Sequence, residues 1–172
     1  PNDGIALFLE NGPDYFYAAW GAQRSGLYYT PISTHLAPAE VAYIVDNCEA
    51  QVVVVSHRLR DVAEQVRAQS PRVRAWLMVG GTAEGFESFE SALDRFPVTP
   101  IENELEGCPM LYSSGTTGYP TGIKNPNPAR PAGTPGPFEM GIMSNFGMNE
   151  ETVYLSPAPL YHAAPLRFCM AM

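Results

Sequence analysis

Hydroxyl side chains and glycines gather in one short stretch of the chain, Y-S-S-G-T-T-G-Y-P-T-G-I-K, from Tyr112 to Lys124. Glycine lets the backbone take positive φ angles and come close to a ligand. Consecutive backbone N–H groups in such a turn form a concavity that binds anions, and Ser and Thr hydroxyls add donors around it. We therefore interpret the stretch as a loop that binds the phosphates of a nucleotide.

An ordinary surface turn of the same composition is the alternative, so the order of the residues decides the interpretation. The stretch does not fit G-x-x-x-x-G-K-[ST], because no Lys-Ser or Lys-Thr pair follows a second glycine. It does not fit G-x-G-x-x-G either, which argues against a Rossmann dinucleotide site. Neither of these two common phosphate motifs explains the stretch.

The order closely resembles the phosphate-loop signature of the adenylate-forming (AMP-binding) enzymes, which include acyl-CoA synthetases, peptide-synthetase adenylation domains and luciferases. A second segment, L-S-P-A-P-L-Y-H-A-A-P from Leu155 to Pro165, is similar to the P-L-[FY]-H segment that follows the loop in that family. Upstream, Gly4 to Phe16, Gly26 to Ser33 and Ala39 to Ser56 fit as well. The resemblance covers essentially the whole chain, and acyl-CoA synthetases (fatty-acid–CoA ligases) are the most similar branch.

The resemblance implies a reaction in two steps and a set of residues for it. A carboxylic acid attacks ATP to give acyl-AMP, and the thiol of coenzyme A then displaces AMP. With Mg²⁺, ATP and CoA as the implied cofactors, Thr117 is the expected metal-binding residue and His162 the expected catalytic residue. The nucleotide phosphates are expected at Ser113, Ser114, Gly115, Thr116, Thr117, Gly118, Thr121 and Lys124. The acid is expected at Tyr161, His162, Ala163 and Ala164.

One position departs from the family pattern. The family usually has a basic residue, mostly Lys, directly after the loop proline, whereas this chain has Thr121 after Pro120. A threonine hydroxyl still donates a hydrogen bond but brings no charge, and a lost charge-assisted hydrogen bond is worth about 1.5–3 kcal/mol. Lys124 follows three residues later and is the candidate to replace that charge.

Several functions stay open on the sequence alone. Within the family that the chain resembles, the stretch Tyr-His-Ala-Ala-Pro-Leu is more similar to members that use fatty or other apolar acids. An acyl-AMP ligase that loads a carrier protein shares every visible motif, and Thr121 also fits a non-catalytic nucleotide-binding module. Residues 1–172 are expected to form the N-terminal portion of an AMP-binding adenylation domain, with the phosphate loop at 112–124, a Pro/Gly-rich loop at 125–137, and no complete catalytic cycle of its own.

The composition of the chain argues against several other classes of protein. The chain of 172 residues is 45% hydrophobic and 16% charged, as expected of a folded globular protein, and its net charge of −8 argues against a nucleic-acid-binding surface. It has no apolar run of about 18 residues, so no transmembrane helix is expected. Three widely spaced cysteines indicate free thiols in a reducing compartment, which favours a cytoplasmic location. A homo-oligomer is compatible with the sequence.

Strand and helix signals alternate along the chain and predict an α/β fold, a parallel-rich sheet with helices on both faces. Val52 to Val55 is the clearest buried strand. Strands are expected at 5–9, 27–31, 51–56, 73–79, 108–112 and 153–156. Helices are expected at 14–25, 38–46, 59–68, 86–95 and 138–146. The proline-rich segment 125–137 is expected to be extended, either as a surface excursion or as a flap over the site.

Overall fold

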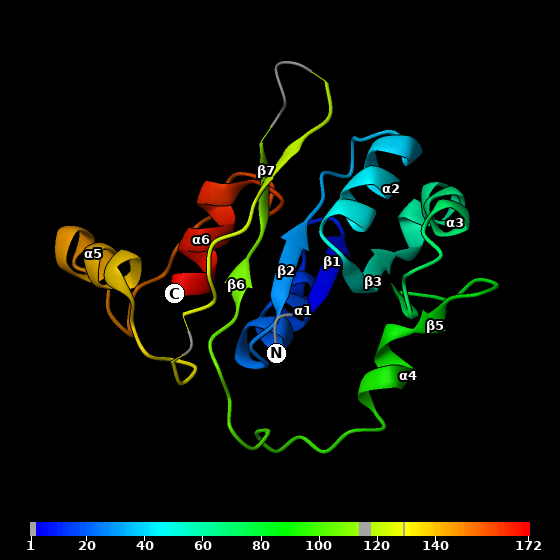
Figure 1. Cartoon of the computed structure of the whole chain (residues 1–172). Coiled ribbons are helices and arrows are strands. Elements are labelled where there is room, and N and C mark those ends of the chain that lie inside the picture. The colour runs from blue at the N-terminus through cyan, green and yellow to red at the C-terminus, as the bar shows by residue number, and fades with distance from the viewer. Residues whose placement is uncertain (1–2, 114–117, 129) are drawn as a thin grey trace.

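The computed structural model describes residues 3–113, 118–128 and 130–172, and a six-stranded parallel sheet lies at its centre (Figure 1). Strand β1 is central, with β2 on one side and β3 on the other, in the order β5-β4-β3-β1-β2-β6. Every pair of neighbouring strands in this sheet is parallel. The strands are β1 (Gly4–Phe8), β2 (Tyr28–Pro31), β3 (Ala50–Ser56), β4 (Ala75–Val79), β5 (Glu87–Ser88) and β6 (Cys108–Pro109).

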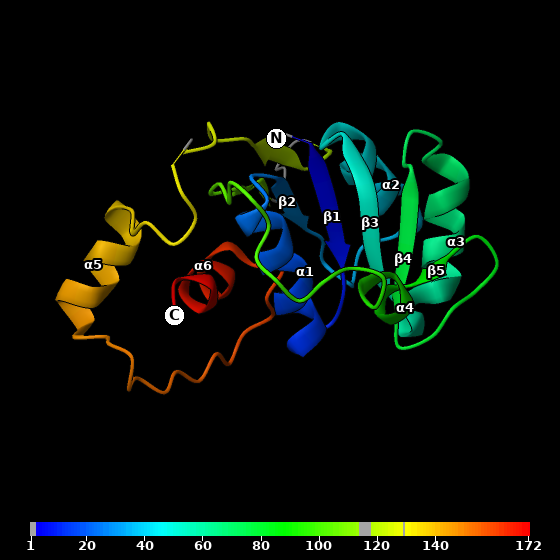
Figure 2. The same ribbon diagram turned by 90° about the horizontal axis from the view of Figure 1, so that it is seen from below.

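Helices cover both faces of this sheet, as Figure 2 shows from below. One face packs against α2 (Pro38–Asn47) and α3 (Arg60–Gln69), and the other against α1 (Pro13–Arg24), α4 (Phe89–Leu93) and α6 (Ala163–Ala171). Alternate residues of the same strand enter the two cores: Val53 and Val55 face α2 and α3, whereas Val54 faces α1. The expected α/β fold class is confirmed.

A small antiparallel hairpin follows the sheet, made of β7 (Leu111–Ser113) and β8 (Thr121–Ile123). The strand expected over 108–112 is interrupted at Met110, so that β6 completes the parallel sheet and β7 begins the hairpin. Beyond the hairpin, α5 (Pro137–Phe146) lies apart from the sheet, and α6 returns to it (Figure 1). No helix within the described ranges is long and apolar enough to cross a bilayer.

The structure corrects two expected elements. Residues 153–156 form no strand; Val153 is 97% exposed and Leu155 84% exposed. The helix expected over 86–95 is only α4, five residues long, because residues 87–88 pair with β4 as β5. A short 3-10 turn, η1 (His57–Leu59), precedes α3.

Candidate active site

The hairpin carries the ends of the signature loop. Ser113, the last residue of β7, pairs with Thr121, the first residue of β8, and both are exposed. Gly118 is exposed and has a φ of 140°, a value that favours glycine. Ser114, Gly115, Thr116 and Thr117 lie outside the described residues. Their expected roles in phosphate and metal binding therefore stay predictions.

Gly122 has a structural reason to be glycine. It pairs with Tyr112 across the hairpin, and a Cβ there would lie 2.9 Å from Cζ of Tyr112 and 2.6 Å from Cε of Met110. The tyrosine ring covers the position that a side chain would need. The hydroxyl of Tyr112 then donates a hydrogen bond of 2.5 Å to Oδ1 of Asn47 at the end of α2.

The ammonium group of Lys124 has two partners at the base of the hairpin, a carboxylate and an aromatic ring. Its Nζ lies 3.7 Å from Oε2 of Glu49 and 4.7 Å from the centre of the Tyr28 ring. Glu49 precedes β3 and Tyr28 begins β2, so these partners lie at the amino ends of the strands. The geometry favours Lys124 as an anchor of the hairpin over Lys124 as the replacement for the missing loop cation.

Asn11 fastens the segment before His162 to the carboxyl end of β1. Its Nδ2 donates to the carbonyl oxygen of Ala158 at 3.2 Å, and its Oδ1 accepts from the amide of Leu160 at 2.8 Å. The buried hydroxyl of Tyr15 donates to the carbonyl oxygen of Leu160 at 3.3 Å. Asn11 lies between β1 and α1 and Tyr15 lies in the first turn of α1, and neither belongs to the signature loop or to the P-L-Y-H segment.

His162 is the N-cap residue of α6, with an exposed side chain, and Ala163 and Ala164 form the exposed first turn of that helix. The positive end of a helix dipole stabilises an anion there. The ring of Tyr161 lies 4.7 Å from the ring of His162, between centroids. The structure thus brings the four expected acid-binding residues together at one helix start.

His35 is a further aromatic residue at this place. It lies in the connection from β2 to α2, and its ring contacts Tyr161 edge-on at a centroid distance of 6.3 Å. Sequence spacing separates His35 widely from His162 and gives no signal for this contact. Only the parallel sheet, which brings the carboxyl ends of β1 and β2 to one edge, makes the two segments neighbours.

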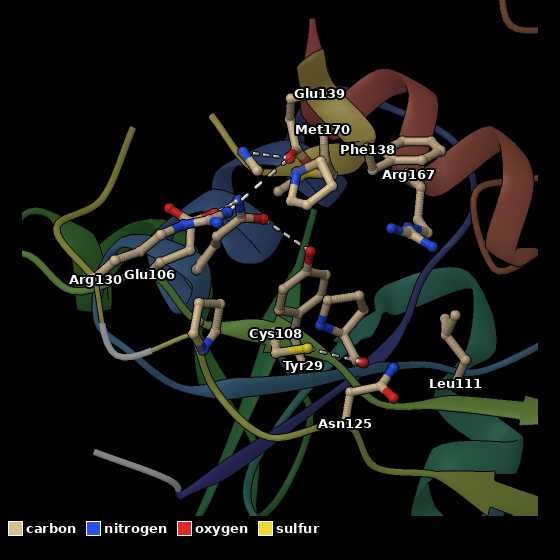
Figure 3. Close-up of a pocket in the computed structure, with 16 residues that line it drawn as sticks. Tyr29, Glu106, Cys108, Leu111, Asn125, Arg130, Phe138, Glu139, Arg167 and Met170 are labelled. Atoms are coloured by element: carbon tan, nitrogen blue, oxygen red, sulfur yellow. Dashed lines mark hydrogen bonds and ion pairs between the residues drawn. The ribbon is translucent and has the colours of Figure 1, made fainter. Parts of the chain in front are cut away.

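A cavity of about 420 Å³ lies on another side of α6, between β6, the segment after β8, and α5 (Figure 3). Tyr29 donates from its hydroxyl to Gln23 Oε1 at 2.8 Å, and Arg167 lies over the Phe138 ring at 4.0 Å. None of the four expected acid-binding residues lines this cavity. The cavity and the helix start at His162 are therefore separate places.

Burial decides the ionisation of three groups near these elements. It raises the pKa of Tyr29, and it raises the pKa of the Cys108 and Cys48 thiols. All three groups are neutral near pH 7, so neither of these two cysteines is an activated nucleophile. Within residues 3–113, 118–128 and 130–172, no group of three or more His, Cys, Asp or Glu side chains could hold a metal ion.

The proline-rich segment runs along the amino side of the sheet. The amide of Ala132 donates to the carbonyl oxygen of Glu104, and the side chain of Asn127 donates to the carbonyl oxygen of Gly26. The hydroxyl of Tyr28 donates to the carbonyl oxygen of Asn125 at 2.8 Å. These contacts favour a surface excursion over a flap above the site.

Comparison with known proteins agrees with this architecture. The family model described as "AMP-binding enzyme" matches residues 1–172. A crotonobetaine/carnitine–CoA ligase of Proteus sp. (strain LE138) is 26% identical, over 93% of this chain and 32% of the relative. The long-chain-fatty-acid–CoA ligase FadD13 of Mycobacterium tuberculosis is 26% identical, over 95% of this chain and 31% of the relative.

Solved structures give the same result. The anthranilate CoA ligase AuaEII in complex with anthranoyl-AMP is 28% identical, with a TM-score of 0.63 over 71% of this chain and 24% of that chain. A putative long-chain-fatty-acid CoA ligase from Rhodopseudomonas palustris, 18% identical, shares the fold with a TM-score of 0.82 over 99% of this chain and 42% of that chain. The chain spans about a third of the length of the CoA ligases that it matches. Because the family model matches this chain from residue 1 to residue 172, the chain belongs to the AMP-binding enzymes.

Proposed function

We propose that the complete gene product activates a carboxylic acid with ATP, forming acyl-AMP and pyrophosphate, and then transfers the acyl group to CoA. The names of the relatives, which are CoA ligases for carnitine and for long-chain fatty acids, support this class of reaction. The proposal extends to the whole protein, because the relatives are about three times as long as the matched chain.

One observation carries the proposal: each of the two motif segments is held to the scaffold of the sheet by side-chain hydrogen bonds. The hydroxyl of Tyr112 in β7 donates to Asn47 at the end of α2 and so holds the hairpin that carries the described ends of the signature loop. Asn11 and Tyr15 fasten the segment before His162 at the carboxyl end of β1. Ligands of parallel sheets bind beyond the carboxyl ends of the strands.

The reaction brings two anions together, so the site must supply positive charge or donors. The first turn of α6 offers free backbone N–H groups at Ala163 and Ala164. His162 beside them is placed to orient the acid carboxylate or to hydrogen-bond charge that develops at the α-phosphorus. The hydroxyls and amides of the signature loop would hold the departing pyrophosphate.

Mg²⁺ enters the proposal only because the sequence resembles a family that uses it. The metal would neutralise phosphate charge in the transition state. The described residues supply no set of His, Cys, Asp and Glu ligands for it, and Thr117, the expected ligand, lies outside them. No step of the mechanism is therefore assigned to the metal.

Small side chains favour an apolar acid. Ala163 and Ala164 leave room at the start of α6, and Tyr161 offers an apolar ring beside them. A fatty acid whose carboxylate lies at His162 would meet these surfaces first. The acceptor, CoA or a carrier protein, is not determined by any of these residues.

A second candidate, nucleotide binding without turnover, has one specific observation in its favour. Thr121 brings no charge to the loop, and Glu49 engages the ammonium group of Lys124. Neither Thr121 nor Lys124, the two positions at which a cation for the phosphates was considered, thus supplies a free positive charge. Binding of ATP could persist in such a protein while pyrophosphate release is slow.

Acid-dependent exchange between ATP and labelled pyrophosphate separates the two candidates. The complete gene product is assayed with short, medium, long and aromatic acids. Exchange with apolar acids is expected, and the preferred acid identifies the substrate. Saturable ATP binding without exchange for any acid would contradict adenylation and favour the binding module. CoA and a phosphopantetheinylated carrier protein, offered as alternative acceptors to the same preparation, then distinguish the two ligase types.

A further inference from the structure

The cavity of about 420 Å³ between β6, α5 and α6 is lined by the guanidinium of Arg167 (Figure 3). Arg167 lies in the second turn of α6, and its Cζ is 4.0 Å from the centre of the Phe138 ring on α5. Within the described part of the chain, Arg167 forms no ion pair with a carboxylate. The ring covers one face of the guanidinium, so the N–H groups at its edge can bind a ligand.

The positive charge of Arg167 acts on the inside of the cavity. Burial raises the pKa of the Cys108 thiol, and the charge of Arg167 opposes that rise. The same two influences act in the same directions on the pKa of Tyr29. Cys108 lines the cavity from β6 and Tyr29 from β2. Because both groups are neutral near pH 7, neither of them neutralises the charge of Arg167.

The other charged side chains of the cavity have partners of their own. Oε2 of Glu139 lies 4.0 Å from Nη2 of Arg130. Glu106 accepts a hydrogen bond of 2.6 Å from Nε2 of Gln23 and one of 3.2 Å from the amide of Gly133. A ligand at Arg167 would therefore lie in a cavity with two carboxylates, and these disfavour a second negative charge on the ligand.

Apolar side chains form much of the remaining wall of the cavity. They are Pro109, Leu111, Pro137, Phe138 and Met170. Sites for small molecules typically have this size and this combination, a mainly apolar lining with a few polar groups that fix the orientation of the ligand. The guanidinium of Arg167 is exposed to solvent, so a ligand can reach it from outside.

We propose that this cavity binds a small carboxylate with an apolar body, whose carboxylate pairs with Arg167 and whose body lies against Leu111 and Met170. The planar guanidinium matches the two oxygens of a carboxylate, and a single cation suits a single negative charge. The site is separate from the residues expected to bind the acid at His162, because none of them lines the cavity. The inference therefore goes beyond the proposed function and does not depend on adenylation.

The test titrates the complete gene product at pH 8 with hexanoate, hexanamide and hexyl phosphate, and follows amide hydrogen exchange peptide by peptide. Hexanoate is expected to slow exchange of residues 106–111 and 137–146 with a Kd of about 1 mM, as suits a ligand of this size. Hexanamide, which lacks the charge, and hexyl phosphate, which carries a second one, are expected to bind about tenfold more weakly. Hexanoate bound at His162 would instead slow exchange of residues 158–166.

Arg167→Gln is expected to raise the Kd for hexanoate, measured at residues 137–146, by about tenfold and to leave the urea unfolding midpoint unchanged. Arg167→Lys keeps the charge but not the planar fork, and should give an intermediate Kd. Arg74→Gln, at an exposed position before β4, is the matched control and should bind hexanoate as the wild type does. Equal Kd values for hexanoate and hexanamide, a Kd that Arg167→Gln does not change, or no slowing at residues 137–146 in about 20 mM hexanoate would each overturn the proposed site.

Discussion

The described residues within 3–93 and those within 108–172 differ in how they are held together. In the first region, side chains such as Leu7, Val54 and Met78 are fully buried between the sheet and its helices. In the second region, strands are two or three residues long, and α5 exposes Met140, Met143 and Phe146 by more than half of their surface. Burial of apolar surface, which provides most of the stability of a fold, is thus concentrated in the first region.

The residues that resemble the family signature lie in the less buried region. The hairpin and the start of α6 carry them, and both are fastened to the sheet by polar contacts from the first region, through Asn47 and Asn11. Binding residues commonly lie on loops that a rigid scaffold positions. The comparison therefore predicts that changes in the first region affect stability, and that changes in the second affect activity at nearly constant stability.

The largest expected effect comes from a matched pair of leucines. Leu7→Ala, at a position with no exposed surface in β1, should lower the free energy of unfolding by about 2–5 kcal/mol, because it removes buried contacts and leaves a cavity. Leu155→Ala, at a position 84% exposed, should change it by less than about 0.5 kcal/mol. Urea unfolding of the two variants measures both values. Equal losses would remove the distinction between the regions.

His162 tests the second half of the comparison. His162→Ala should lower acid-dependent exchange by about 100-fold, the effect of losing one group that stabilises developing charge, and leave the unfolding midpoint unchanged because the side chain is exposed. His57, which directly follows β3 at the same edge of the sheet, provides the control His57→Ala. A loss of exchange as large in His57→Ala would mean that the edge as a whole, and not His162, supports the reaction.

The sequence predicted the first region well, because local and long-range preferences agree there. Val52 to Val55 could only be a buried strand, and the helices around it have regular apolar spacing. Val153 to Ser156 has one β-branched residue and two other apolar side chains but forms no strand, and Val153 is 97% exposed. Local pattern measures the tendency to pair and cannot show whether a partner strand is present.

The candidate site was predictable only as far as its motifs. The order of residues in the signature loop and in the P-L-Y-H segment predicts positions for phosphate and acid, and these positions stay predictions. His35 and Asn11 carry no such pattern, since each contributes one ring or one amide from a connection far away in sequence. Their roles follow from the parallel sheet, which decides which loops become neighbours.

Thr121 should give the smallest effect, and in the opposite direction. Thr121→Lys is expected to raise acid-dependent exchange by about three- to tenfold, less than a buried charge-assisted hydrogen bond would give, because position 121 is exposed and water screens the charge. Thr99→Lys adds the same charge at another exposed position and should leave exchange unchanged. Stability should not move in either variant. If exchange is unchanged or falls in Thr121→Lys, the missing charge is not a defect, and hydroxyls and backbone amides without a lysine at position 121 are enough for the reaction.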